Sequence, residues 1–213
     1  MNLEYVSPGE IEARSFEIIE GEIKNKFCGK EISRDIKPVV MRVIHTTADF
    51  DYLDNLKFSE NVISIACEAL KNGAVIVTDT NMARSGINKS ALKKLNCEAV
   101  CFMSDEDVAE TARSKNITRA AASVDKAVSL GKPVIYAVGN APTALIRICE
   151  HIKHDGFRPT LVIGVPVGFV NVVQSKEMLI SSGVPYIASM DRKGGSNVAA
   201  AICNALLYMT SGR

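Results

Sequence analysis

The segment Ala74-Val75-Ile76-Val77-Thr78-Asp79-Thr80 marks the point at which the pattern of the chain changes. Its apolar, β-branched run is short, unbroken and followed at once by polar residues, which is typical of a strand buried on both faces. Four similar runs follow, separated by stretches with helical periodicity, over residues 99–103, 133–138, 160–165 and 185–190. The sequence therefore predicts a three-layer α/β fold with a five-stranded parallel sheet.

Right-handed crossovers between five parallel strands are satisfied most simply by the flavodoxin-like strand order 2-1-3-4-5. Before the first strand, hydrophobic periodicity predicts extra N-terminal helices over residues 8–27, over residues 36–49, and from Phe58-Ser59-Glu60 to Asn72. We expect one domain over residues 1–213, in which residues 1–73 are helical and residues 74–213 alternate between strands and helices.

Composition argues against several classes of partner. Lys and Arg number 25 against 24 acidic residues, so no field of one sign favours nucleic acid or an anionic membrane. No apolar run approaches the roughly 20 residues that span a bilayer. The segment Met1–Tyr5 lacks the pattern of a signal peptide, so we expect a cytoplasmic protein.

Cysteine and histidine usage predicts neither a disulfide framework nor a metal site. The six cysteines contain no Cys-x-x-Cys pair and are expected to be reduced thiols; they are Cys28, Cys67, Cys97, Cys101, Cys149 and Cys203. His151 and His154 have no accompanying cluster of ligands, so they are expected to be solvated.

The predicted helix over residues 36–49 carries the best acid–base candidate. Helical spacing places Arg42, His45 and Asp49 together on the face opposite its apolar residues. An imidazole between a cation and a carboxylate is a candidate general acid or base. The same stripe is also typical of a solvated helix face with an ordinary cluster of charges.

The carboxyl ends of the predicted strands meet at one edge, where open α/β sheets bind ligands. Four loops at this edge are rich in Gly, Pro and Asn, and they cover residues 78–82, 139–143, 166–169 and 191–196. Glycines let a ligand approach the backbone, helix N-termini suit carboxylates or phosphates, and Arg119, Arg192 and Lys193 add cationic donors. The same residues also make tight turns and caps without a ligand. No dinucleotide or phosphate-loop fingerprint is present, which argues against a nucleotide as the ligand. Taken with the cationic donors, the residues predict a small enzyme for an anionic ligand.

The segment Gly139-Asn140-Ala141-Pro142-Thr143-Ala144-Leu145 resembles a segment of the precorrin-8X methylmutases, a family of cobalamin synthesis that also acts on cobalt-precorrin-8. Further segments support the resemblance and follow the family's order; they are Arg14-Ser15-Phe16, Arg42-Val43-Ile44-His45, Thr118-Arg119-Ala120-Ala121-Ala122, Val165-Pro166-Val167-Gly168-Phe169-Val170, Ser175-Lys176-Glu177 and Arg192-Lys193-Gly194-Gly195-Ser196.

The resemblance implies an isomerase that moves a methyl group from C-11 to C-12 of a tetrapyrrole, giving hydrogenobyrinate or its cobalt counterpart cobyrinate. It implies a [1,5]-sigmatropic shift without a cofactor, and a homodimer. It also implies that His45 is the catalytic proton donor or acceptor and that Ser15 and Arg42 contact the substrate. Small residues are expected after the histidine where this chain has Thr46-Thr47-Ala48-Asp49, so no catalytic role is carried over to Asp49.

The loop edge supplies the other substrate contacts that we expect, namely Thr78, Asp79, Met82, Arg119, Gly139, Asn140, Ala141, Thr143, Val167, Gly168, Lys193, Gly194, Gly195 and Ser196. Two alternatives remain: a non-catalytic tetrapyrrole-binding carrier, and a flavodoxin-like nucleotide-dependent oxidoreductase, which the missing phosphate fingerprint disfavours. Cobalt-bearing and metal-free substrates, and pockets built by one subunit or by two, are all compatible with these residues.

Overall fold

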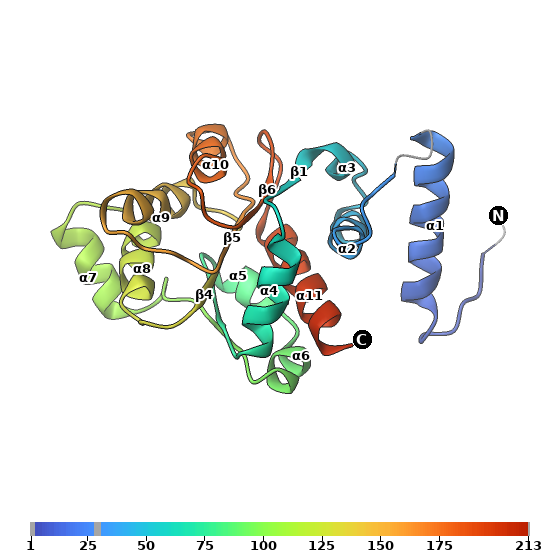
Figure 1. Cartoon of the computed structure of the whole chain (residues 1–213), viewed down its shortest axis with the longest axis horizontal. Coiled ribbons are helices and arrows are strands. Elements are labelled where there is room, and N and C mark those ends of the chain that lie inside the picture. Colours follow the sequence, from blue (N-terminus) through green and yellow to red (C-terminus); the bar gives the residue numbers. More distant parts are fainter. Residues whose placement is uncertain (1–2, 28–30, 213) are drawn as a thin grey trace.

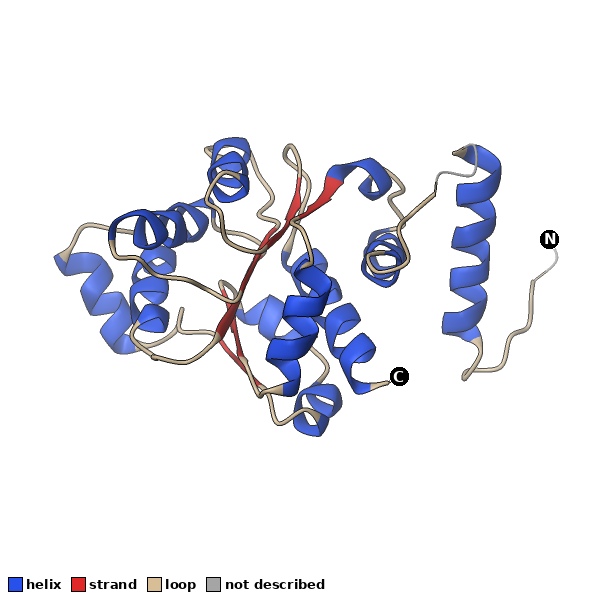
Figure 2. Cartoon of the chain, viewed as in Figure 1, coloured by secondary structure: helices blue, strands red, loops and turns tan. Residues whose placement is uncertain are grey.

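The computed structural model describes residues 3–27 and 31–212, in which a six-stranded sheet lies between layers of helices (Figure 1, Figure 2). The strands are β1 (Leu56–Phe58), β2 (Val75–Thr78), β3 (Glu98–Val100), β4 (Val134–Val138), β5 (Leu161–Gly164) and β6 (Tyr186–Ser189). Their order across the sheet is β1-β6-β5-β4-β2-β3. Strands β2 to β6 pair in parallel, whereas β1 pairs antiparallel with β6.

The central strands are buried on both faces because their side chains alternate between two cores. Ile76 and Ile135, which are paired across β2 and β4, point into one core. Val75 and Tyr136 point into the other. The unbroken apolar runs seen in the sequence are therefore what a sheet covered on both sides requires.

Helices cover both faces of the sheet (Figure 1). One layer contains α4 (Val62–Lys71), α5 (Asn81–Gly86), α6 (Lys89–Lys94) and α11 (Ser196–Ser211). The other contains α7 (Glu106–Ser114), α8 (Arg119–Val128), α9 (Pro142–His154) and α10 (Val172–Ile180).

The first three helices extend the side that α11 occupies. They are α1 (Ile11–Lys26), α2 (Lys37–Thr47) and α3 (Tyr52–Asn55). Helix α2 packs its apolar face on α11, and α1 lies beyond α2 at one end of the molecule (Figure 1). Residues far apart in the chain thus meet where α1, α2 and α11 converge.

Several predicted elements need correction. The sheet has six strands rather than five and is mixed rather than wholly parallel, because Leu56–Phe58 forms the edge strand β1. Three residues are too few to display an alternating pattern, and the helix predicted to start at Phe58 begins at Val62 instead. Helix α2 ends at Thr47, since Ala48 adopts the left-handed conformation, and this places Asp49 outside the helix.

Among residues 3–27 and 31–212, no helix has the length and apolar character that spanning a membrane requires. The cysteines at positions 67, 97, 101, 149 and 203 are free thiols, and Cys28 lies outside the described residues.

Candidate active site

His45 lies in the last turn of α2, with its side chain exposed. Residues Val43 and Ile44 on the opposite face of the helix are buried, so the packing of α2 turns His45 outward. Its ring lies 5.3 Å from the ring of Phe16 on α1, measured between centroids. Two helices therefore fix the surroundings of this imidazole.

A cavity of about 280 Å³ opens beside His45. Its wall is formed by α2, by Gly86 at the end of α5, and by one face of α11, and its lining residues are Arg42, His45, Thr46, Gly86, Asn197, Ala200, Ala201, Asn204 and Tyr208. A second cavity of about 410 Å³ adjoins it and shares Arg42 and Tyr208 as a common wall. Volumes of this size are typical of small-molecule sites.

Arg42 is held between two aromatic rings. Its guanidinium carbon lies 4.9 Å from the ring centroid of Phe16 and 5.1 Å from that of Tyr208. The side chain also forms an ion pair with Glu12 of α1, and only 16% of it is exposed. The predicted pairing of Arg42 and His45 on one face is confirmed, but the nearest carboxylate belongs to Glu12 rather than to Asp49.

Ser15 lies on α1 next to Phe16 and is partly buried. Its hydroxyl donates a hydrogen bond to the carbonyl oxygen of Ile11 at 2.8 Å. This bond leaves the hydroxyl oxygen able to accept another hydrogen bond.

The carboxyl edge of the sheet differs from what the glycine-rich loops predicted. The carboxylate of Asp79 accepts hydrogen bonds from the N–H groups of Gly139 at 2.9 Å and of Asn140 and Ala141 at 2.7 Å. Asp79 is 6% exposed, and burial raises its pKa while the three donors oppose that shift. The donors that we expected to bind a ligand anion are therefore used by a carboxylate of the chain itself.

Two of the edge glycines, Gly139 and Gly194, allow loops to pack against one another. A Cβ atom at Gly194 would lie 2.0 Å from the carbonyl oxygen of Val165, and one at Gly139 would lie 2.8 Å from that of Gly195. Ser196 shares a hydrogen bond of 2.8 Å with Thr80. At Gly139 and Gly194, backbone of the same chain therefore fills the space beside the glycine that we expected a ligand to approach.

Lys193 is likewise committed to the fold. Its ammonium group contacts the carboxylates of Asp49 at 2.6 Å and Asp51 at 2.5 Å, and these contacts raise its pKa. Asp49, which the sequence left without a role, thus ties the loop after α2 to the loop after β6.

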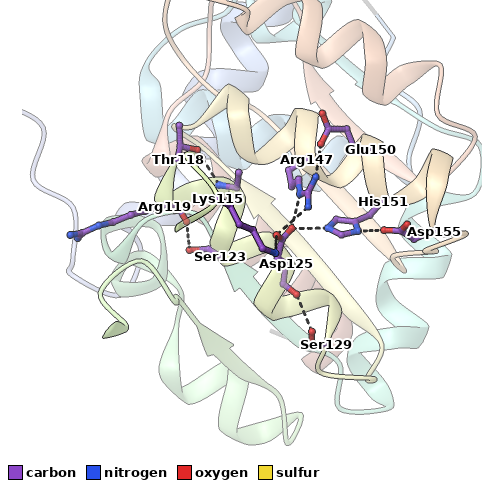
Figure 3. A network of polar contacts seen from close by, with 11 residues as sticks. Lys115, Thr118, Arg119, Ser123, Asp125, Ser129, Arg147, Glu150, His151 and Asp155 are labelled. Carbon is purple, nitrogen blue, oxygen red and sulfur yellow. Dashed lines mark hydrogen bonds and ion pairs between the residues drawn. The ribbon is translucent and has the colours of Figure 1, made fainter. Parts of the chain in front are cut away.

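The remaining predicted contacts are of two kinds. Thr78 is buried and donates a hydrogen bond to Thr80 O at 3.0 Å, and Thr143 accepts one from Thr118 at 2.9 Å. Side chains that stay exposed are Met82, Arg119, Asn140 and Val167, and Gly168 is partly exposed. Figure 3 shows Arg119 extending away from its neighbours, and within residues 3–27 and 31–212 its guanidinium makes no hydrogen bond or ion pair.

Comparison with known proteins decides the family. The model of the CbiC precorrin-8X methylmutase family matches residues 10–209. The chain belongs to the precorrin-8X methylmutase family.

Named relatives and a solved structure support the same family. The cobalt-precorrin-8 methylmutase of Salmonella typhimurium is 47% identical over 204 residues, which is 94% of this chain and 95% of that protein. The protein of the same name from Leptospira interrogans is 44% identical over 212 residues, with 95% and 94% covered. The precorrin-8X methylmutase of Pseudomonas aeruginosa is 35% identical, with 96% and 97% covered. A crystal structure of precorrin-8X methylmutase from Thermus thermophilus superposes with a TM-score of 0.86 at 37% identity, covering 95% of this chain and 98% of that one.

The cavity beside His45 also contains residues that were not among the expected substrate contacts. Asn204 accepts a hydrogen bond from Asn88 N at 2.8 Å and donates one to Gly86 O at 2.9 Å. Tyr208 accepts a hydrogen bond from the Asn88 amide at 3.0 Å. A sequence signal existed, because Asn197, Asn204 and Tyr208 recur at helical spacing along one face of α11.

The two other histidines, His151 and His154, lie away from the cavity beside His45. His151 lies between Asp125, 2.8 Å from Nε2, and Asp155, 2.5 Å from Nδ1, in the network of Figure 3. Burial acts to raise the pKa of Asp125, but hydrogen bonds from Arg147 and His151 hold it below its usual value. His154 is exposed, and the described part of the chain contains no cluster of three metal-binding side chains. His151 joins α8 to α9 and, contrary to the sequence prediction, is not simply solvated.

Proposed function

We propose that this methylmutase moves a methyl group from C-11 to C-12 of the precorrin-8 macrocycle and that His45 donates and recovers the proton that enables the shift. The observation that carries the proposal is the position of His45, exposed beside the cavity shared by α2, α5 and α11. No other histidine of the chain lies at this cavity.

The proposed chemistry is an isomerisation. One carbon–methyl bond breaks at C-11 while another forms at C-12, so no methyl donor and no redox equivalent is consumed. A proton placed on the conjugated ring by His45 makes the carbon that receives the methyl group electron-poor and lowers the barrier, and the same proton returns to the imidazole afterwards. General acid catalysis of this kind contributes typically ~10²–10⁴-fold.

The ring of Phe16 offers an apolar surface beside the imidazole. We assign binding of the peripheral carboxylates to Arg42, with Ser15 as a further contact. Because Arg42 already pairs with Glu12, a substrate carboxylate would have to replace or join that partner. Arg119, Asn140, Met82 and Val167 are exposed and remain proposed contacts at the outer edge.

The same proposal includes a cobalt-bearing substrate and a homodimer. The relatives named for cobalt-precorrin-8 that are given above have the higher identities, which favours the substrate with cobalt.

Tyr5 and Ile11 expose apolar surface on or near α1, where a second subunit would bury it. Light scattering would give twice the mass of 23.0 kDa for the dimer, and the monomer mass would contradict it.

One experiment tests the reaction. The purified protein is incubated with cobalt-precorrin-8, and in parallel with the metal-free form, and the products are identified by absorbance and mass spectrometry. Formation of cobyrinate at unchanged mass supports the proposal. Binding without conversion would instead indicate a carrier, and bound flavin would indicate an oxidoreductase.

A further inference from the structure

Lys176 is the one lysine among the described residues that the fold buries completely. It lies in the middle of α10 and is 0% exposed. Lysine is almost never fully buried without a partner, because removing its charge from water is costly. The proposed reaction gives it no part, so its position needs another explanation.

Two main-chain carbonyl groups provide its partners. The ammonium group donates hydrogen bonds to Asp191 O at 2.8 Å and to Lys193 O at 2.7 Å. Ser189 also donates to Lys193 O, at 2.6 Å. Lys176 therefore bridges Asp191 and Lys193, the first and last residues of a three-residue turn.

The turn that it joins has an unusual backbone. Asp191 has φ of 53°, which a residue with a side chain rarely adopts, and Gly194, directly after the turn, has φ of 156°. A conformation of this kind persists only where surrounding contacts hold it in place. The two bonds from Lys176 supply such contacts.

The residue between the two clamped carbonyls is Arg192. Its side chain is exposed, and its guanidinium carbon lies 5.2 Å from the ring centroid of Phe169, itself 80% exposed. Across residues 3–27 and 31–212 the Arg192 guanidinium forms no hydrogen bond or ion pair. Gly168 N donates to Arg192 O at 3.4 Å, which links the two loops.

The neighbouring Lys193 is not available to bind an external anion in place of Arg192. Lys193 is directed to Asp49 and Asp51. Arg192 therefore keeps its donors for a group outside the chain, and the adjoining Phe169 and Val170 expose apolar surface beside them. A guanidinium group that lies on an aromatic ring can bind a carboxylate with two hydrogen bonds, which suits a carboxylate at the periphery of a flat, conjugated macrocycle.

We propose that Lys176 is a positioning residue, which fixes the turn Asp191–Lys193 so that Arg192, lying on Phe169, binds a peripheral carboxylate of the substrate. This inference rests on the proposed function, because it takes a polycarboxylate tetrapyrrole as the ligand.

The test is a double-mutant cycle on the full chain with two readouts. Affinity for cobyrinate is measured by absorbance titration, and KM and kcat are measured with cobalt-precorrin-8. The variants are Lys176→Met, Arg192→Gln and the double variant, and Lys153→Met on the exposed face of α9 is the matched control.

Each single variant is expected to weaken cobyrinate binding and raise KM by about tenfold, with kcat within about twofold, as for loss of one charge-assisted contact. The double variant is expected to bind no more weakly than Arg192→Gln alone, because Lys176 acts through Arg192. The control should match the wild type. Unchanged binding in Lys176→Met, or losses that multiply to about a hundredfold, would overturn the inference.

A second variant tests the same inference if Lys176→Met does not fold. Ser189→Ala removes one bond to the same carbonyl and should weaken binding by a few-fold, but only when Arg192 is present. An equal loss in the Arg192→Gln background would overturn the inference. A wild-type protein that binds no cobyrinate would contradict the proposed function, and that result is distinct from intact wild-type binding that the variants leave unchanged.

Discussion

The ring of Phe16 lies against the imidazole of His45, with 5.3 Å between their centroids. The two residues come from different helices, α1 and α2, and the same Phe16 ring also contacts the Arg42 guanidinium. The position of α1 thus sets the surroundings of both side chains that we assign to the reaction.

Replacing His45 should abolish proton transfer but spare binding. We expect His45→Gln to lower kcat by ~10²–10⁴-fold, with cobyrinate affinity close to that of the wild type. His151→Gln, at the distant α8–α9 contact, is the control for loss of a histidine and should keep kcat. Full turnover by His45→Gln would exclude it as the proton donor.

Arg42 and Glu12 should have opposite effects on binding. Arg42→Gln removes a charge-assisted contact worth roughly 1.5–3 kcal/mol, which corresponds to about a 10- to 150-fold rise in KM. Glu12→Gln removes the carboxylate that pairs with Arg42 and should leave KM unchanged or lower it. Steady-state kinetics on both variants checks this, and equal affinity of Arg42→Gln and the wild type would refute the assignment.

Asp79 should contribute to stability rather than to substrate binding. Asp79→Ala leaves three N–H groups of the β4–α9 loop without their partner, and we expect a loss of about 3–5 kcal/mol in the free energy of unfolding. Asp107→Ala breaks an exposed ion pair with Lys126 and should cost less than about 1 kcal/mol. Urea denaturation measures both, and similar losses in the two variants would show that the three bonds contribute little.

The buried Lys176 should make stability depend on pH. Burial lowers its pKa from 10.5 to about 8. Between these values the unfolded chain holds a proton that the folded chain has lost, so the free energy of unfolding rises with pH over this window. Relative to Lys176→Met, the wild type should gain up to about 3 kcal/mol between pH 8 and pH 10.5. The free energy of unfolding of both proteins is measured by urea denaturation at each pH. A difference between them that stays constant from pH 8 to pH 10.5 would contradict the lowered pKa.

The sheet could be predicted from the sequence where its strands are long enough to show a pattern. The run Val75–Thr78 and the three later runs that form β4, β5 and β6 are apolar because both faces are covered, and the predicted run over residues 99–103 overlaps the edge strand β3. Strand β1 could not be predicted, since its three residues belong to the sheet only through pairing with β6, more than a hundred residues further along the chain.

The site could be predicted only in part, for the same reason. Arg42 and His45 are three residues apart in one helix, so periodicity alone placed them together. The partner of Lys193 is Asp49, 144 residues earlier, and the partner of the Gly139 N–H is Asp79, 60 residues earlier. Composition marks such residues as polar, but only the folded chain determines whether their partner is a ligand or another side chain.

The carboxylate of Asp79 also competes with free anions for the three N–H donors that it accepts from. Being part of the chain, it reaches the three N–H donors without the loss of translational freedom that a free anion pays on binding. Phosphate or nucleotides would have to displace it to bind at the junction of β2 and β4, where proteins of this architecture often hold them. We therefore expect phosphate and nucleotides to be excluded from these three N–H groups while the carboxylate of Asp79 stays in place.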